Sequence, residues 1–185
     1  MSEQLVDIVD ENDVVIDVVS REAAHKKRLP HRVVNIWFFN NNEEVLMQKN
    51  AADKRHDAGS LSETVGGHVD AGETYDEAAI RETKEETGLE LRLDDLVPVA
   101  VQTLTEKDKK NGMTHGRKVY AYTFLGNKED LRGSEDEVAG FEWVSVRKFL
   151  GQDVSLQGRV ASYLFGFDGL FLRFLKMAFE AARRK

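Results

Sequence analysis

The feature that most constrains this chain is a glycine-containing loop followed by a helix with three carboxylates on one face. Residues 67–89 read GHVDAGETYDEAAIRETKEETGL. The part from 74 to 87 has few β-branched residues and predicts a helix, in which Glu82, Glu85 and Glu86 lie at positions i, i+3 and i+4. Like charges at this spacing repel one another, so the helix itself gains no stability from them. The cluster therefore indicates that a cation neutralises it.

Oxygen ligands of this kind narrow the choice of cation. Carboxylates are hard ligands, and they suit Mg²⁺ or Mn²⁺ better than zinc or copper. Glycine lets the backbone approach a ligand closely, so we expect the carbonyl of Gly66 or Gly67 to join the metal ligands. The residues alone leave one alternative open, in which the glutamates form a solvated acidic face that pairs with Arg81 and Lys84.

The spacing within this segment resembles the Nudix box, in which a glycine, five residues, a glutamate and seven residues precede Arg-Glu-apolar-x-Glu-Glu-x-Gly-apolar. The positions that match are Gly67, Glu73, Arg81, Glu82, Glu85, Glu86, Gly88 and Leu89. Thr83 departs from the pattern, because an aliphatic residue is usual at its position. Threonine keeps a branched methyl group and can bond to its own helix backbone, so we expect a small loss of packing and no change in chemistry.

The resemblance implies a fold and a chemistry. The fold is an α/β/α sandwich around a mixed β-sheet. The chemistry is hydrolysis of a diphosphate linkage in a nucleoside diphosphate derivative, with Mg²⁺ or Mn²⁺ as the cofactor. Matched position by position, the resemblance implies that the three glutamates of the helix are the catalytic residues. It implies that the metal ligands are Gly67, Glu82, Glu85 and Glu86. Glu73 and Arg81 are expected to form an ion pair that holds the loop on the helix, and Gly88 is a further structural position of the box.

The resemblance extends upstream of the box. Residues 6–90 look like the corresponding part of isopentenyl-diphosphate isomerases and their hydrolase relatives. The shared features are DEND-x-VI near the start, a histidine before an HR pair, and the strand EVLMQK. On this resemblance, His25, His31 and His68 match the histidine metal ligands of the isomerase.

Two positions conflict with isomerase chemistry. The isomerase requires a cysteine just before the box glycine, where this chain has Gly66, and the chain contains no cysteine. It also requires a glutamate pair on the next long strand, where residues 114–117 read THGR. We therefore expect the histidines to be a family remnant, with His31 at the surface or in a turn and His68 in a loop. A second metal site built from His25, His31 and His68 stays open as an alternative.

Three alternatives to a nucleotide-directed hydrolase remain. One is the isomerase. Another is a catalytically silent nucleotide-sensing module, although such modules usually lose carboxylates that are intact here. The third is an enzyme for capped or non-nucleotide polyphosphates, which the sequence does not separate from the main interpretation.

Basic and acidic residues near the box are candidates for substrate contacts. Lys49 closes a predicted strand, and Lys54 and Arg55 lie in the loop before the box. Lys49 and Arg55 are the preferred phosphate-binding candidates, with a solvated basic loop as the alternative. The acidic run 135–137 precedes a strand, and Glu137 is its candidate substrate contact, with a solvated charge run as the alternative.

Composition limits the partners of the chain. It has 33 acidic and 26 basic residues and a formal net charge of −7, so it lacks the excess of cations that a nucleic-acid binder uses. The absence of cysteine excludes disulfide scaffolds and thiolate zinc sites. No run of about 18 apolar residues predicts a membrane span, and the first residues do not resemble a secretory signal. We expect a cytoplasmic protein whose partner is a small diphosphate, with a homodimer as an open alternative.

The remaining pattern predicts one domain over residues 1–185. Apolar, β-branched runs predict a β-hairpin over 5–19 and strands at 33–39, 44–48, 96–104, 118–125 and 138–144. The helix over 74–87 begins with Thr74 and Glu77, which are spaced as in a capping box. Short helices are expected at 21–27 and after Ser145.

A last helix is predicted over 168–184. Its polar positions form one stripe, which consists of Arg173, Lys176, Glu180 and Arg183. Most of its circumference is therefore apolar, and we expect it to pack on the core, with a dimer interface as the alternative. Trp37, Phe38 and Phe39 alternate on a strand and are also expected in the core.

Overall fold

The computed structural model describes residues 3–52, 57–105, 114–133, 138–165 and 169–184. The described strands are β1 (Leu5–Val9), β2 (Val15–Ser20), β3 (His31–Phe39), β4 (Glu44–Asn50), β5 (Leu61–Ser62), β6 (Val65–His68), β7 (Val97–Gln102), β8 (His115–Thr123) and β9 (Val138–Ser145). The described α-helices are α1 (Arg21–Lys27), α2 (Tyr75–Thr87), α4 (Val146–Leu150), α5 (Ser162–Phe165) and α6 (Leu170–Ala182). Short 3₁₀ turns in the described part of the chain lie at Leu93–Asp95, Lys128–Asp130 and Val154–Leu156.

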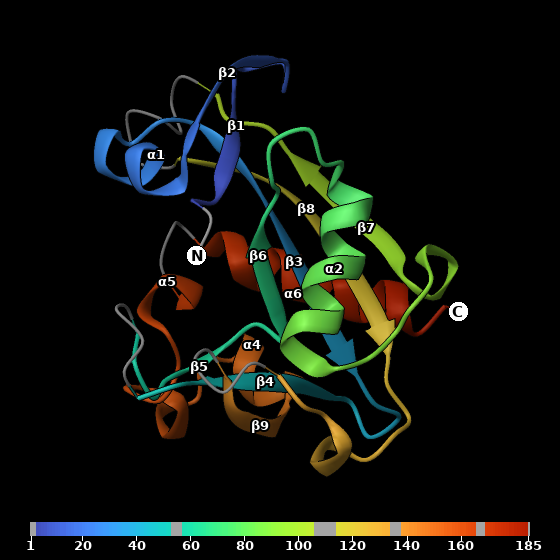
Figure 1. Ribbon diagram of the computed structural model, residues 1–185. Helices are drawn as coiled ribbons and strands as arrows, with labels where there is room; N and C mark the ends of the chain where they lie inside the picture. The colour runs from blue at the N-terminus through green and yellow to red at the C-terminus, as the bar shows by residue number, and fades with distance from the viewer. Residues whose placement is uncertain (1–2, 53–56, 106–113, 134–137, 166–168, 185) are drawn as a thin grey trace.

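Strand β3 is the centre of a mixed sheet. It pairs with β8 in parallel along its whole length and with β6 in antiparallel orientation over residues 33–36. Figure 1 shows β3 and β8 side by side and pointing the same way. Strand β7 extends the sheet beyond β8, the β1–β2 hairpin joins the start of β3, and β4 carries β5 and β9.

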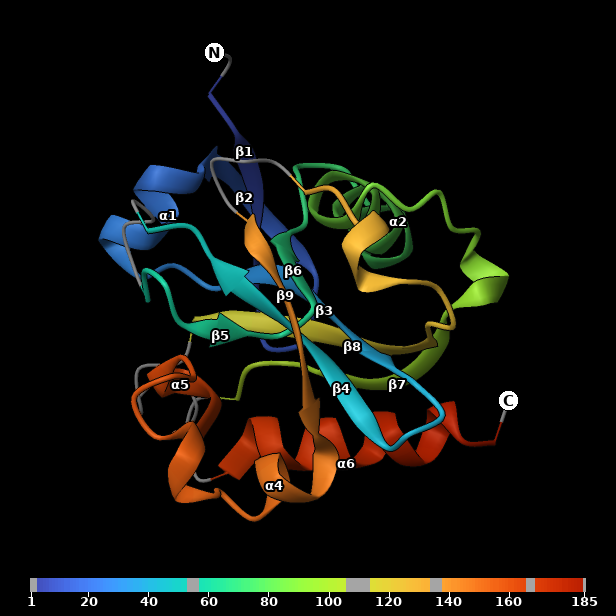
Figure 2. The same cartoon turned by 90° about the horizontal axis from the view of Figure 1, so that it is seen from below.

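Both faces of β3 are buried, because helices cover the sheet on two sides. Ile36 and Phe38 belong to the core beneath α2, whereas Trp37 and Phe39 belong to the core that includes α4 and α6. Figure 2 shows α2 on one side of the sheet and α4 and α6 on the other. The expected α/β/α sandwich around a mixed sheet is therefore confirmed, as is the place of these aromatic side chains in the core.

Helix α2 has the ends that its sequence predicts. The Thr74 hydroxyl accepts a hydrogen bond from the Glu77 backbone, and the Glu77 carboxylate accepts one from the Thr74 backbone, which completes the capping box. Gly88 ends the helix with a positive φ of 75°, a backbone conformation that glycine adopts without strain. Thr83 is fully buried in this helix, and its hydroxyl donates to the Ala79 carbonyl.

Two strands differ from the predicted pattern. Strand β8 begins at His115, three residues before the predicted 118, because its first residues pair with the start of β3. The glycines expected in a loop lie instead in β6, where Gly66 and Gly67 pair with Asn35 and Val34 of β3. Glycine has a low propensity for strands, but pairing with the edge of β3 outweighs it here.

Helix α6 packs on the sheet, as its apolar circumference predicts. Phe171, Phe174, Leu175 and Ala178 are buried in the core that contains β3 and β8, and the predicted polar stripe is exposed. The helix spans Leu170–Ala182, while residues 166–168 lie outside the described part of the chain. None of the described helices is long and apolar enough to cross a membrane.

Candidate functional site

The three candidate glutamates of α2 differ in exposure. Glu82 and Glu86 are 7% and 3% exposed, whereas Glu85 reaches into solvent. The burial of two carboxylates on the sheet side of a surface helix is costly unless they have partners. The structure supplies such partners from the neighbouring strand and from the same helix.

Strand β6 contacts the carboxylates directly. The backbone N–H of Gly66 donates to Glu86 Oε2 at 3.0 Å. A Cβ atom at Gly67 would lie 1.9 Å from the Glu82 carboxyl carbon, so only glycine fits beside this side chain. The Gly67 backbone is therefore in close contact with the Glu82 side chain.

Arg81 supplies the cationic partner. It donates to both oxygens of Glu73, at 2.9 and 2.8 Å, and its Nη1 lies 2.8 Å from Glu82 and 3.2 Å from Glu85. Its Nη2 also donates to the carbonyl of His68 at 2.8 Å. The expected Glu73–Arg81 pair is present, and these contacts raise the pKa of Arg81. Part of the negative charge that a metal would neutralise is thus already balanced by one guanidinium.

A cavity of about 1030 Å³ lies beside β6. It is lined by Arg21, Glu22, His25, Lys26, Gln48, Asn50, Asp57, Ser62, Glu63, Gly66 and Tyr163. Gly66 is common to the cavity wall and to the hydrogen bond with Glu86. The cavity and the carboxylates of α2 therefore meet at one strand.

The wall of the cavity contains buried polar groups. Glu63, 8% exposed, accepts hydrogen bonds from Asn35 at 2.6 Å and from the Tyr163 hydroxyl. Arg117 lies behind them and donates to Asn35, and burial lowers the pKa of its guanidinium. Gln48 is 2% exposed, and its amide nitrogen is buried without a hydrogen-bond partner among the described residues. A polar ligand is the kind of molecule that such a wall accommodates.

The residues predicted to contact the substrate do not line the cavity where the structure describes them. Lys49 is exposed on β4 and does not belong to the cavity lining, while Lys54, Arg55 and Glu137 lie outside the described residues. Among the described residues, the cations that line the cavity are Arg21 and Lys26, from α1. Sequence reasoning missed both, because a short basic helix resembles a solvated surface and its position over the cavity depends on tertiary packing.

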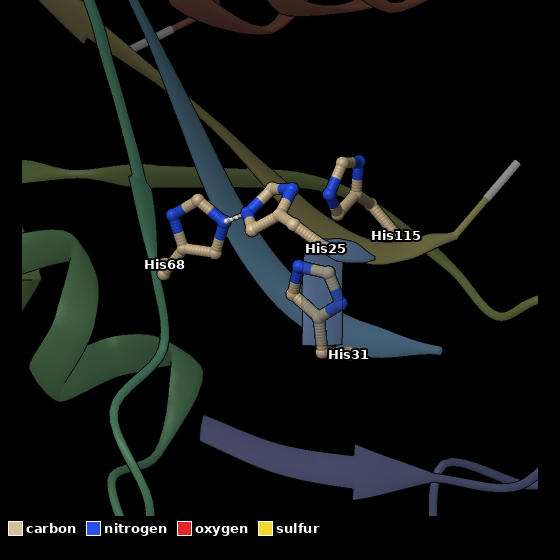
Figure 3. A group of neighbouring side chains, drawn as sticks. All are labelled: His25, His31, His68 and His115. Atoms are coloured by element: carbon tan, nitrogen blue, oxygen red, sulfur yellow. Dashed lines mark hydrogen bonds between the residues drawn. The ribbon is translucent and has the colours of Figure 1, made fainter. Parts of the chain in front are cut away.

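Four histidines from separate elements meet near this cavity. His25 comes from α1, His31 from β3, His68 from β6 and His115 from β8, and one ring nitrogen of each lies within 4.8 Å of the others. Figure 3 shows the four rings gathered in one place. The expected places of two of these histidines were wrong: His31 is fully buried in a strand and not at the surface or in a turn, and His68 ends β6 and is not in a loop.

Three of the four histidines have lowered pKa values, which favour their neutral form. Burial lowers the pKa of His31, and burial together with nearby cationic groups lowers the pKa of His68 and of His115 to about 2. Neutral imidazole is the form that binds metals. His115 was missed as a candidate, because in the sequence it was noted only as a departure from the glutamates of the isomerase.

Comparisons with known proteins agree with this architecture. Isopentenyl-diphosphate Δ-isomerase 1 of Aromatoleum aromaticum is 38% identical over 148 residues, which are 79% of this chain and 79% of that protein. An uncharacterized Nudix hydrolase of Streptomyces coelicolor, SCO1686, is 39% identical over 87 residues, 47% of this chain and 48% of that protein.

Solved structures agree on the fold. DR0079 of Deinococcus radiodurans superposes with a TM-score of 0.73 at 24% identity and covers 92% of this chain and 98% of its own. The model of the NUDIX domain matches residues 29–164, which include the box and strands β3 to β9 but not the β1–β2 hairpin or the α1 residues of the cavity wall. The chain therefore belongs to the NUDIX domain family.

Proposed function

We propose that this protein hydrolyses a diphosphate linkage in a nucleoside diphosphate derivative, with Mg²⁺ or Mn²⁺ as cofactor. The observation that carries the proposal is the position of Gly66, which lines the cavity and donates its N–H to the buried carboxylate of Glu86. A substrate in the cavity would thereby lie next to the carboxylates of the box.

The donor set fits a hard divalent cation. Three carboxylates of α2 offer oxygen ligands, those of Glu82, Glu85 and Glu86. The Gly67 backbone lies so close to Glu82 that no side chain would fit between them. We assign the metal to these three carboxylates and the Gly67 carbonyl. A bound divalent cation would neutralise the diphosphate and lower the pKa of a water molecule.

The residues of this chain would do the remaining work. Arg21 and Lys26, at the cavity wall, attract the anionic diphosphate. A box glutamate within hydrogen-bonding reach of the attacking water accepts its proton. Arg81 keeps the loop on the helix, so that the carboxylates hold their positions while their charge changes.

An isomerase is the second candidate, because several similar proteins have that name. Two observations oppose it. The chain has no cysteine, and a Cβ atom at Gly66 would lie 2.7 Å from Glu63 Oε1, so Glu63 occupies space that a side chain at this position would need.

A product assay over substrate classes tests the proposal. The wild-type protein is incubated with Mg²⁺ or Mn²⁺ and with nucleoside triphosphates, nucleotide sugars, ADP-ribose, dinucleoside polyphosphates or isopentenyl diphosphate. Products are separated by chromatography, and Glu86→Gln protein is the blank. Turnover of a nucleoside diphosphate derivative that the variant lacks supports the proposal. Conversion of isopentenyl diphosphate to its allylic isomer would establish the isomerase, and metal-dependent binding of a ligand without turnover would indicate a sensing module.

A further inference from the structure

Strands β4 and β5 contribute a polar wall to the cavity. Gln48 and Ser62 lie opposite each other in this pairing, so their side chains lie on the same face of the sheet, and both line the cavity. Asn50, two residues beyond Gln48, lines it as well. The exposed side chain of Lys49 lies on the other face, because side chains alternate along a strand. Among the described residues, these two strands therefore offer hydrogen-bonding groups and no apolar side chain to a ligand.

The carboxamide of Gln48 lacks part of its hydrogen bonding in this wall. Gln48 is 2% exposed, and its amide nitrogen is buried without a hydrogen-bond partner among the described residues. Its amide oxygen is 3.4 Å from the Ser62 hydroxyl, which lies closer to the side-chain oxygen of Asn50, at 3.2 Å. A buried donor in this state costs free energy, so a ligand in the cavity that accepts a hydrogen bond from Gln48 would remove that cost.

The carboxylate of Glu63, the residue after Ser62, is fixed in the same wall. The Asn35 amide donates to one of its oxygens at 2.6 Å, and the Tyr163 hydroxyl donates to the other. Burial and the negative charge of Glu63 raise the pKa of Tyr163, so this hydroxyl keeps its proton and remains a donor. A carboxylate has about four acceptor positions, so Glu63 can accept from a ligand in addition to these two donors.

Charge distinguishes two sides of the cavity. Arg21 and Lys26 line it from α1 and attract phosphate oxygens, whereas Glu63 repels them. A Cβ atom at Gly66 would lie 2.7 Å from Glu63 Oε1, so this carboxylate also lies next to the strand that contacts the box. We therefore expect a phosphorylated substrate to direct its phosphates towards α1 and the box, and its organic part towards the wall of β4 and β5.

We propose that Gln48 and Glu63 determine substrate specificity by binding an organic part that carries both hydrogen-bond donors and acceptors, as a nucleobase or a sugar does. Gln48 donates to an acceptor of this part, and Glu63 accepts from a donor. A substrate with an apolar tail, such as an isoprenoid diphosphate, would form neither bond, so the cavity selects against it. The inference rests on the proposed function only in placing the substrate in this cavity.

Binding of six monophosphates tests the inference without turnover, because none of them contains a diphosphate linkage. Wild-type protein with Mg²⁺ is titrated by calorimetry with AMP, CMP, GMP, UMP, ribose 5-phosphate and isopentenyl phosphate. We expect at least one of the polar ligands to bind about tenfold or more tighter than isopentenyl phosphate. Differences among the four nucleotides would identify the base as the bound group, whereas equal affinity for ribose 5-phosphate would identify the sugar.

Gln48→Met keeps the length of the side chain and removes its hydrogen-bonding groups. It should reduce the preference for the polar ligand about tenfold or more and leave the affinity for isopentenyl phosphate unchanged. The melting temperature of the ligand-free protein should stay the same or rise, since an unpaired buried donor is gone. Gln157→Met is the matched control, because Gln157 is exposed, and it should change none of these values. Glu63→Gln should also reduce the preference, and Gln48→Met decides alone if that variant does not fold.

The inference is overturned if isopentenyl phosphate binds as tightly as the polar ligands, if none of the six ligands binds, or if Gln48→Met binds all of them like the wild type. Equal weakening of all six together with a lower melting temperature would also overturn it, since that result would show a structural role for Gln48. A protein that prefers a polar ligand but hydrolyses no diphosphate would support this inference and overturn the proposed function.

Discussion

Arg81 holds the carboxylate of Glu73 with two parallel hydrogen bonds, Nε to Oε1 at 2.9 Å and Nη2 to Oε2 at 2.8 Å. Glu73 Oε2 also accepts a hydrogen bond from the backbone N–H of Asp70. The Glu73 carboxylate therefore connects the loop before α2 to Arg81 of the helix. Paired, planar contacts of this kind suit arginine and not lysine, because only the guanidinium offers two donors in one plane.

Arg81→Lys should lower the free energy of unfolding by about 2 kcal/mol, since a lysine keeps the charge and loses the paired hydrogen bonds. Urea denaturation of the metal-free protein measures the change. Lys84→Ala on the same helix is the control, because the Lys84–Glu90 pair is fully exposed and screened by solvent, so its loss should change the free energy of unfolding much less. Equal losses in the two variants would show that the contacts of Arg81 are no stronger than a surface pair.

Glu86→Gln should reduce kcat by about a hundredfold or more, because an amide neither binds a hard cation well nor accepts a proton. Stability should change little in the absence of metal, since the amide oxygen still accepts the Gly66 N–H. Steady-state kinetics and thermal unfolding are the two measurements, with exposed Glu90→Gln as the matched control. A variant that is unfolded without metal would contradict a mainly chemical role and point to a structural one.

Gly67→Ala should abolish most activity and weaken Mg²⁺ binding, because the new methyl group would lie 1.9 Å from the Glu82 carboxyl carbon and displace it. Gly116→Ala is the matched control, since its nearest contact would be an ordinary 3.4 Å to the Tyr75 hydroxyl. Calorimetric titration with Mg²⁺ and the hydrolysis assay report on the two effects. If Gly67→Ala retains normal Mg²⁺ affinity, Glu82 and Gly67 are not ligands of the same ion.

Asp76 gives a pH dependence with a defined sign. Its carboxylate accepts hydrogen bonds from Lys118 and Tyr120 of β8, and these lower the pKa of Asp76 below its ordinary value of 3.8. A depressed folded-state pKa stabilises the protein above that ordinary value, and the contribution is lost as the pH falls through the folded-state pKa. Asp76→Asn should therefore cost about 0.5–1 kcal/mol at pH 7, a figure reduced for solvent exposure of the side chain.

Denaturant unfolding at a series of pH values checks this expectation. The difference between wild type and Asp76→Asn should be constant from pH 7 to about pH 5 and should shrink below pH 4. A difference in the free energy of unfolding that stays constant down to pH 2 would mean that the charge of Asp76 contributes nothing to stability. Only the packing and neutral hydrogen bonds of its side chain would then matter.

The sequence alone predicted the structural features that depend on residues close to one another along the chain. Helix α2 has the expected capping residues, and the i, i+3 and i+4 spacing alone placed its three carboxylates near one another. The alternation of Phe38 with Trp37 and Phe39 likewise follows from strand geometry, although the sheet decides which helix each side chain meets. The spacing of residues along a helix or strand fixes the direction in which their side chains point, because the period of each element is the same in every protein.

The isomerase resemblance had already grouped His25, His31 and His68, but only the tertiary structure added His115 to them and placed Arg21 and Lys26 at the cavity wall. His31 and His115 lie 84 residues apart in the sequence and become neighbours because β3 and β8 pair in parallel with these two residues in register. Register between distant strands depends on the packing of the whole sheet against its helices, and a shift of one residue would turn a side chain to the opposite face. No local pattern carries that information, so the sequence determined the box and its helix, and the folded sheet determined the histidine cluster.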